Sequence, residues 1–212
     1  MRRAASFCMA VGLVAGGSLV PLRGSTDKKG PDAERVAQLI RQLGDDNFRR
    51  REAASKELTA LGEPALAALK KAAASDGDPE IRRRAEGITQ TITRCLTDAE
   101  QKRLEGNWVA VADEANGKEA PSRNKLVLAD GRSIATDSAG VEIFRCTWRV
   151  IDPTAVPRQL DLVGPDGRVF QAIYEFDGAK LRYCGPYTKR PDRFSTNPGD
   201  GQYMATLKRA PK

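Results

Sequence analysis

The spacing of hydrophobic residues changes about halfway along the chain, and this change limits the fold more than any other feature. Between residues 31 and 94, apolar side chains recur with the period of a helix, as Val36, Leu39 and Leu43 do at i, i+3 and i+7. After residue 106, short runs alternate apolar and polar residues, which is typical of strands with one buried face. We therefore expect an α+β chain of 212 residues in two parts, the first helical and the second rich in strands.

Four helices are expected in the first part, and the short segments that connect them are rich in glycine and aspartate, which end one helix and cap the next. These connecting segments are Gly44-Asp45-Asp46, Gly62 and Ser75-Asp76-Gly77. Pro64 and Pro79 then occupy the first turns of the third and fourth helices, where proline is favoured.

The second and fourth of these helices share the order Asp-x-x-x-Arg-x-x-Ala at an offset of 32 residues. The aligned residues are Asp46, Arg50 and Ala53 in one copy and Asp78, Arg82 and Ala85 in the other. With this order, the segment from Leu39 to Leu69 resembles the HEAT-like segments of exported or regulatory planctomycete proteins. The resemblance implies that the alanines let helices approach and that Asp and Arg tie neighbouring turns together; a site for an acidic protein partner is the alternative.

The junction between the two parts has its own signals. The order Thr97-Asp98-Ala99-Glu100 matches a capping box, so we expect one short separate helix before Gly106. Two repeats are fewer than the roughly three that bury a continuous core, and residues 94–97 hold no Gly, Pro or Ser. We therefore expect the strand-rich part to pack against the helices and cap them.

Eight strands are expected in the second part, with no helix between them. They are residues 108–112, 125–129, 132–136, 141–150, 159–163, 169–176, 180–184 and 203–208. Asp130-Gly131, Asp166-Gly167 and Asp177-Gly178 stand where tight hairpins need a positive φ. Eight strands joined by hairpins form an antiparallel meander, and such a meander closes naturally into an up-and-down β-barrel.

Five ordered blocks between Ala99 and Arg209 resemble the uncharacterised planctomycete C-terminal domain family, which has a lipocalin-like fold and no assigned activity. The blocks are Leu104-Glu105-Gly106-Asn107-Trp108; Asp152-Pro153-Thr154 with Pro157 and Asp161-Leu162; Ile173-Tyr174-Glu175 with Asp177-Gly178; Leu181 with Cys184; and Arg190-Pro191 with Phe194-Ser195 and Pro198-Gly199. The resemblance implies a lipocalin-like barrel in which Lys208 or Arg209 covers Trp108. Cys146 and the Asp192-Arg193 pair depart from the family pattern.

Alternation assigns two rows of bulky side chains to the barrel interior. Phe144, Cys146, Trp148 and Val150 form one row, and Phe170, Ala172, Tyr174 and Phe176 form the other. In a short barrel these aromatics favour a filled interior, and a cavity for one small apolar ligand is the alternative. The candidate ligand-binding residues are Trp108, Phe144, Trp148, Phe170, Tyr174 and Phe176.

The first residues indicate export. Arg2 and Arg3 precede an uncharged stretch from Ala4 to Val20 and then small residues, which is the layout of a secretory signal. The expected organisation is a signal peptide at 1–24, a HEAT-like domain at 25–96 and a lipocalin-like barrel at 97–212. An extracytoplasmic location follows, either secreted or periplasmic, with anchoring by an uncleaved signal as the alternative.

Several chemistries are excluded by composition. The chain has no histidine, so serine–histidine triads, cysteine–histidine pairs and histidine metal sites cannot form. The net charge of +7 falls to +4 without residues 1–24, and it is mixed in sign, which argues against nucleic-acid binding. Alternation points Asp161 and Glu175 outward, so we expect no catalytic carboxylate pair.

Three cysteines remain once the expected signal peptide is removed, namely Cys95, Cys146 and Cys184. They have no metal-binding spacing and are expected to be small buried residues. A bridge between Cys146 and Cys184 is the alternative. We therefore expect an exported, non-catalytic protein without metal or cofactor that acts as a protein-interaction or scaffold module through its helices. A carrier or sensor of a small apolar ligand is the alternative function.

Overall fold

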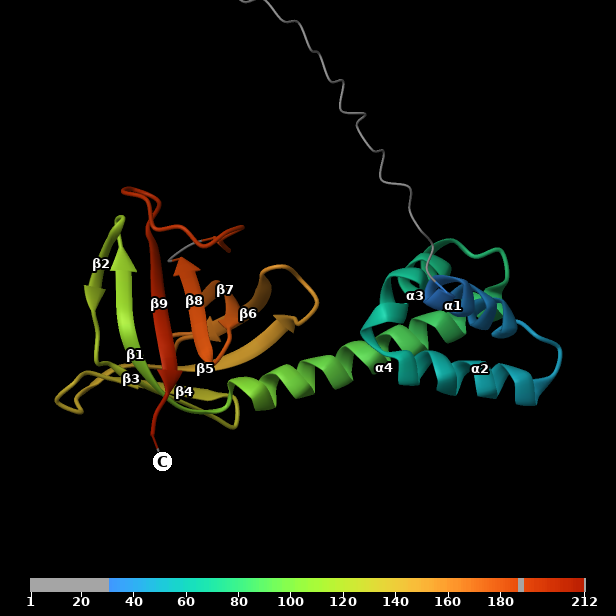
Figure 1. The fold of residues 1–212 in the computed structure, drawn as a ribbon, viewed down its shortest axis with the longest axis horizontal. Coiled ribbons are helices and arrows are strands. Elements are labelled where there is room, and N and C mark those ends of the chain that lie inside the picture. The colour runs from blue at the N-terminus through green and yellow to red at the C-terminus, as the bar shows by residue number, and fades with distance from the viewer. Residues whose placement is uncertain (1–30, 187–188, 212) are drawn as a thin grey trace, which may run out of the picture.

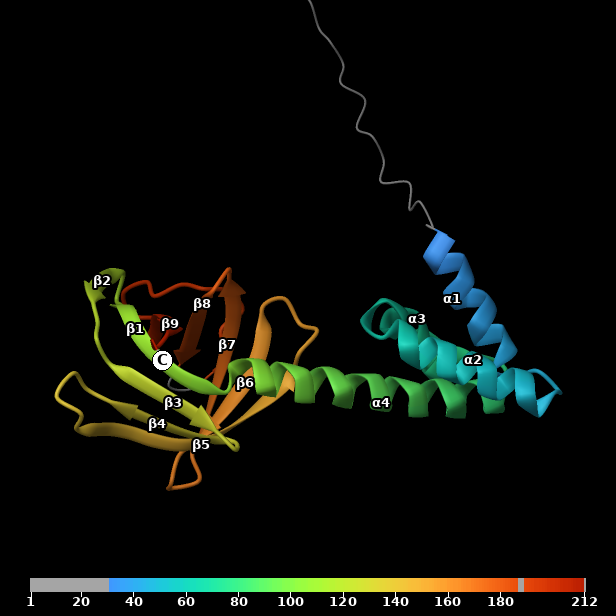
Figure 2. The same cartoon turned by 60° about the horizontal axis from the view of Figure 1, so that its bottom comes forward.

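The computed structural model describes residues 31–186 and 189–211, which form four helices and one antiparallel sheet of nine strands. The helices are α1 (Pro31–Gln42), α2 (Phe48–Leu61), α3 (Glu63–Ser75) and α4 (Pro79–Leu104). The strands are β1 (Gly106–Ala115), β2 (Lys118–Pro121), β3 (Lys125–Ala129), β4 (Arg132–Thr136), β5 (Glu142–Asp152), β6 (Arg158–Val163), β7 (Val169–Asp177), β8 (Lys180–Pro186) and β9 (Gln202–Arg209). Helices α1 to α3 gather around one end of the long helix α4, and the sheet lies at its other end (Figures 1 and 2). The expected signal segment at 1–24 lies outside the described residues.

Helices α2 and α4 begin in the same way. Asn47 caps α2 by accepting a hydrogen bond from the Arg49 N–H at 2.8 Å, and Asp78 caps α4 by accepting one from the Glu80 N–H at 2.8 Å. The side chain of Asp45 accepts from the Asn47 N–H in the same way as the side chain of Asp76 accepts from the Asp78 N–H.

The repeated residues differ by one position from the alignment made on the sequence. Arg51 donates to the Asp45 and Asp46 carbonyls, and Arg82 donates to the Asp76 and Gly77 carbonyls. The alanines at equivalent positions, Ala54 and Ala85, are both buried. Asn47, Arg51 and Ala54 therefore match Asp78, Arg82 and Ala85, and the predicted offset of 32 residues is one too long. Each helix contains three consecutive arginines, residues 49–51 in α2 and 82–84 in α4. An alignment of the two helices that is wrong by one residue therefore still places arginine opposite arginine.

The four helices share one hydrophobic cluster. Its largest fully buried side chains are Leu43 from the end of α1, Leu58 from α2 and Leu69 from α3. Helix α4 adds Ile88 and Ile92 to the same cluster. The expected apolar stripes of the first part are therefore confirmed, and they bury each other at one end of α4.

Helix α4 continues without a break from Pro79 to Leu104, so the expectation of a short separate helix after Thr97 is wrong. Residues 94–97 contain no Gly or Pro to end a helix, and a capping box acts only where a helix begins. The expected domain boundary after Leu96 thus lies inside a continuous helix. The expectation that the barrel caps the helices is also wrong, since the helical cluster and the barrel cluster are separate and α4 joins them.

The sheet closes on itself as an up-and-down barrel. Consecutive strands pair in the order β2-β1-β3-β4-β5-β6-β7-β8-β9, and β1 pairs with β9 to complete the ring. The first half of β1 pairs with β3 and its second half with β2, so β2 and β3 occupy one position of an eight-stranded barrel. All eight expected strands are confirmed, and β2 was missed because Lys118–Pro121 is exposed along its whole length and has no apolar alternation.

Candidate ligand-binding site

The barrel encloses a cavity of about 550 Å³. Its wall is mainly apolar, with side chains from nearly every strand, including Leu126, Leu128, Leu160, Leu162, Leu181 and Leu207. The expectation that bulky aromatics fill the barrel is therefore wrong, since this volume remains between them. Most ligand pockets have volumes of roughly 300–1,000 Å³, and this cavity lies within that range.

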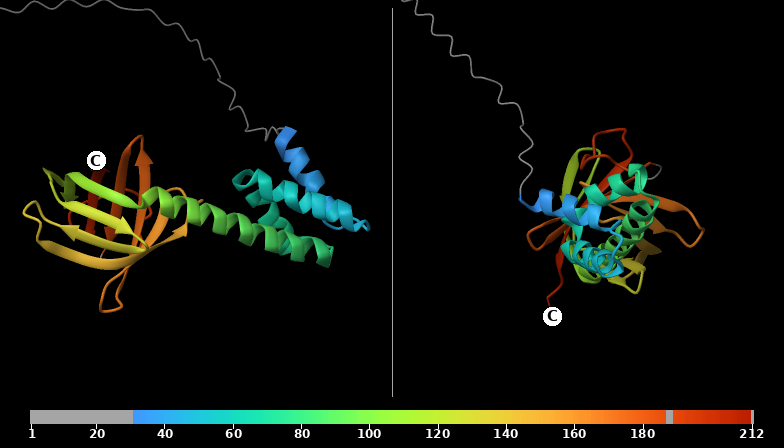
Figure 3. Two further views of the ribbon diagram at one scale, coloured as in Figure 1. Left: turned by 90° about the horizontal axis from the view of Figure 1, so that it is seen from below. Right: turned by 90° about the vertical axis from the view of Figure 1, so that its right-hand side faces the viewer.

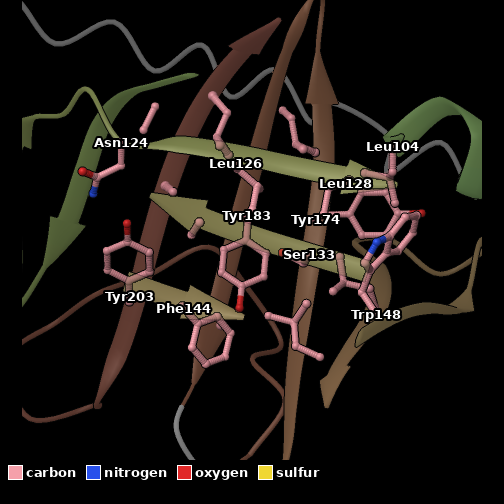
Figure 4. Close-up of a pocket in the computed structure, with 18 of the residues that line it drawn as sticks. Leu104, Asn124, Leu126, Leu128, Ser133, Phe144, Trp148, Tyr174, Tyr183 and Tyr203 are labelled. Carbon is pink, nitrogen blue, oxygen red and sulfur yellow. The ribbon is translucent and has the colours of Figure 1, made fainter. Parts of the chain in front are cut away.

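The six candidate residues from the sequence divide into two groups. Phe144, Trp148, Phe170 and Tyr174 line the cavity. Trp108 and Phe176 do not line it: Trp108 belongs to the hydrophobic cluster of the barrel, and Phe176 packs against that cluster with its ring centroid 6.3 Å from that of Trp108. Figure 4 shows Trp148, Tyr174 and Leu104 at one end of the cavity and Tyr203 and Asn124 toward the other end.

The last turn of α4 forms the floor of the cavity. Leu104 is 1% exposed and contributes its side chain to the cavity wall, and its carbonyl accepts a hydrogen bond from the Trp108 Nε1 at 2.8 Å. The Arg103 guanidinium lies 3.7 Å from the centroid of the Phe176 ring on the same side. The buried end of α4 therefore closes one end of the cavity. Figure 3 shows the same helix running from the other helices to the barrel.

A second arginine completes this closed end. The Arg209 guanidinium lies 3.9 Å from the centroid of the Trp108 ring and donates to the carbonyls of Arg103 and Glu105 at the end of α4. Gly106 has a φ of 131°, and a Cβ there would overlap this guanidinium. Of the two basic residues that the resemblance proposed for this role, Arg209 performs it.

A hydrogen bond connects the cavity wall to α4. The Tyr174 hydroxyl donates to Glu100 Oε2 at 3.2 Å, and the same carboxylate is ion-paired with Arg158 at 3.5 Å. Burial raises the pKa of Tyr174 well above its usual value, and the negative charge of Glu100 raises it further. The phenol therefore stays protonated and keeps donating to the helix.

The opposite end of the barrel is open to solvent. Ile143 is 53% exposed and Phe144 is 38% exposed, although both contribute to the cavity wall. The Phe144 and Phe170 rings meet edge to face there, with centroids 5.9 Å apart. A ligand therefore has a path into the cavity at this end.

Polar groups line the open half of the cavity, and sequence reasoning missed them. Asn124 Nδ2 donates to Asp113 Oδ2 at 3.3 Å, and both residues belong to the cavity wall. Asp113 Oδ1 is buried and has no hydrogen-bond partner. Alternation counted from Trp108 points Asp113 outward, so no signal in the sequence marked it.

The cysteines and the two carboxylates agree with the sequence predictions in part. Cys95, Cys146 and Cys184 are all free, so the alternative disulfide is not formed. Cys146 and Cys184 are buried as expected, but the expectation is wrong for Cys95, which is exposed on α4. Asp161 is ion-paired with Arg190 at 2.5 Å, and Glu175 is ion-paired with Arg182 at 2.6 Å. Each carboxylate thus has its own arginine partner.

Residues 31–186 and 189–211 contain no cluster of three or more Cys, Asp or Glu side chains that could hold a metal ion. None of the helices in this part of the chain combines the length and the hydrophobicity that crossing a membrane requires.

Comparisons with known proteins add no relative. No family model matches the chain, no curated protein matches it, and no solved structure matches it.

Proposed function

We propose that the barrel binds a small, mainly apolar ligand in its cavity. The observation that carries this proposal is the volume of about 550 Å³ that apolar side chains enclose, open at one end and closed by α4 at the other. Transfer of apolar surface from water into such a site contributes roughly 25 cal/mol for each Å² buried. This reading replaces the filled barrel that the sequence favoured, and it describes a carrier or sensor and not an enzyme.

A lipocalin-like relationship fits the same geometry. The closed eight-stranded meander, the Gly106-x-Trp108 order at the start of β1 and the arginine over Trp108 all agree with the resemblance found in the sequence. The two separate hydrophobic clusters support a division into a helical domain and a barrel domain. We place the division within α4, near its contact with the barrel.

The helices form the second element of the proposal, a HEAT-like module that binds a protein partner. The repeated starts of α2 and α4, with their equivalent caps, arginines and buried alanines, support this assignment. Phe48 at the start of α2 is 61% exposed, which leaves a large apolar side chain available for contact. The two arginines at positions 2 and 3, followed by the uncharged stretch from Ala4 to Val20, support an extracytoplasmic location for the whole protein.

Native mass spectrometry of the protein taken from its own cell tests the ligand proposal. The expected mass exceeds that of the processed chain by one small molecule that organic solvent extracts. The extracted protein should then bind an apolar fluorophore with a stoichiometry of one. A chain without added mass that also fails to bind the fluorophore would refute the proposal.

A further inference from the structure

We propose that the ligand carries a cationic head group with N–H donors, such as a primary ammonium, and that Asp113 binds it at the open end of the barrel. This inference rests on the proposed function, because it names the chemistry of the ligand in the same cavity. Three observations carry it: an irregularity in β1, an unpaired carboxylate oxygen, and the distribution of polarity along the cavity.

A β-bulge in β1 turns Asp113 toward the cavity. Ala110 pairs with Leu207 and Ala112 pairs with Thr206, so Val111 is an extra residue in the ladder between β1 and β9. Beyond the bulge the alternation is reversed, and Asp113 comes to lie opposite Ala205. Ala205 and Asp113 both belong to the cavity wall. A regular strand would have placed this carboxylate on the outer surface of the barrel.

The Asp113 carboxylate accepts fewer hydrogen bonds than it can. Oδ2 accepts one long bond from Asn124, and Oδ1 is buried without a partner. Burying a carboxylate oxygen without a hydrogen-bond partner costs free energy. A ligand that donates a hydrogen bond to Oδ1 would remove this cost and so bind more tightly. The torsion about the Cβ–Cγ bond of aspartate is broad, so the proposed contact involves a rotation of the carboxylate that turns Oδ1 toward the bound head group.

The polarity of the cavity matches an amphipathic molecule. The closed end, formed by Leu104, Trp148 and Tyr174, suits an apolar body, whereas Asn124 lies toward the other end (Figure 4). Asp113, which accepts the hydrogen bond from Asn124, lines the same cavity. Among the described residues that line the cavity, Asp113 is the one acid and Lys125 the one base. Because Lys125 is exposed to water while Asp113 is partly buried, the carboxylate gains more from an opposite charge.

Competition binding with three decyl compounds tests this inference. Decylamine, decanol and decanoate share one apolar body, and each is titrated against a bound apolar fluorophore below its solubility limit or the concentration at which it forms micelles. We expect decylamine to bind about tenfold or more tightly than decanol, and decanoate to bind most weakly. Asp113→Asn should remove the preference for the amine and leave decanol binding unchanged. Glu119→Gln removes an exposed carboxylate from neighbouring β2 and should keep the preference.

A comparison within the wild-type protein does not depend on how the variant folds. Decyltrimethylammonium carries the same charge as decylamine but has no N–H donor, so it should bind more weakly than decylamine. Equal binding of decylamine and decanol, or tighter binding of decanoate, would overturn the role of Asp113 and leave the proposed function standing. Failure of all the decyl compounds and of the fluorophore to bind would overturn both.

Discussion

The Tyr174 hydroxyl, which lies in the cavity wall, donates a hydrogen bond to Glu100 on α4. Glu100 belongs to the same continuous helix that contributes Ile88 and Ile92 to the helical cluster. This bond therefore joins the wall of the barrel cavity to the helix that leads to the helical cluster.

Removing this bond should weaken the junction. Glu100→Gln leaves Tyr174 with a weaker acceptor and Arg158 without its charged partner, and we expect a loss of about 1–2 kcal/mol in the free energy of unfolding. Asp98→Asn, a change of the same kind at an exposed position on the same helix, should have little effect. Urea melts of both variants measure the difference. Equal stability of Glu100→Gln and wild type would contradict this role.

The raised pKa of Tyr174 predicts a loss of stability at high pH. The folded protein holds the phenol protonated, whereas the unfolded chain ionises it at the usual pKa of 10.0. The unfolded state thus binds fewer protons above that pH, and the free energy of unfolding falls as the pH rises through 10. Absorbance titration should show one tyrosine that ionises only on unfolding. In Tyr174→Phe this tyrosine should be missing; its persistence there would assign the shift to another residue.

Arg209 should be needed to hold α4 against the barrel. Arg209→Ala removes the cation over Trp108 and two hydrogen bonds to carbonyls at the end of α4, so we expect a loss of about 2 kcal/mol. The exposed neighbour Lys208 provides the matched control, Lys208→Ala. Thermal melts followed by Trp fluorescence report the change. A larger effect of the Lys208 variant would show that the assignment is wrong.

The three free cysteines within residues 31–186 should differ in reactivity. Burial raises the pKa of the Cys146 and Cys184 thiols, so both should react slowly with a thiol reagent in the native protein. Cys95 on the exposed side of α4 should react quickly. Mass spectrometry after timed labelling should find one fast site and two slow ones. Fast labelling of Cys146 would mean that the barrel wall opens readily.

The sequence predicted the strands better than the cavity, for physical reasons. The hairpin of β3 and β4 has its expected bounds because Asp130 and Gly131 form a turn with φ of 50° and 70°, which few other residues adopt. The inward row of Cys146, Trp148 and Val150 is buried as alternation requires. Alternation shows which side chains face inward but not whether they meet across the barrel, so the sequence favoured a filled interior and kept the cavity only as the alternative.

Two other features depend on contacts that no local pattern encodes. The bulge at Val111 reverses the alternation of β1 after it, and only the pairing with β9 reveals it. The contact between the last turn of α4 and the barrel, through Leu104 and Trp108, likewise joins two elements whose packing no local pattern predicts.

The most direct test of the ligand proposal fills the cavity. Ala135 lines the cavity from β4, and the next residue back along the strand, Ile134, faces the outer surface. Titration of an apolar fluorophore should show saturable binding to wild type and to Ile134→Phe. Ala135→Phe, which places a ring in the cavity, should bind at least tenfold more weakly while melting at a similar or higher temperature. Undiminished binding by a folded Ala135→Phe would contradict a ligand site inside the barrel.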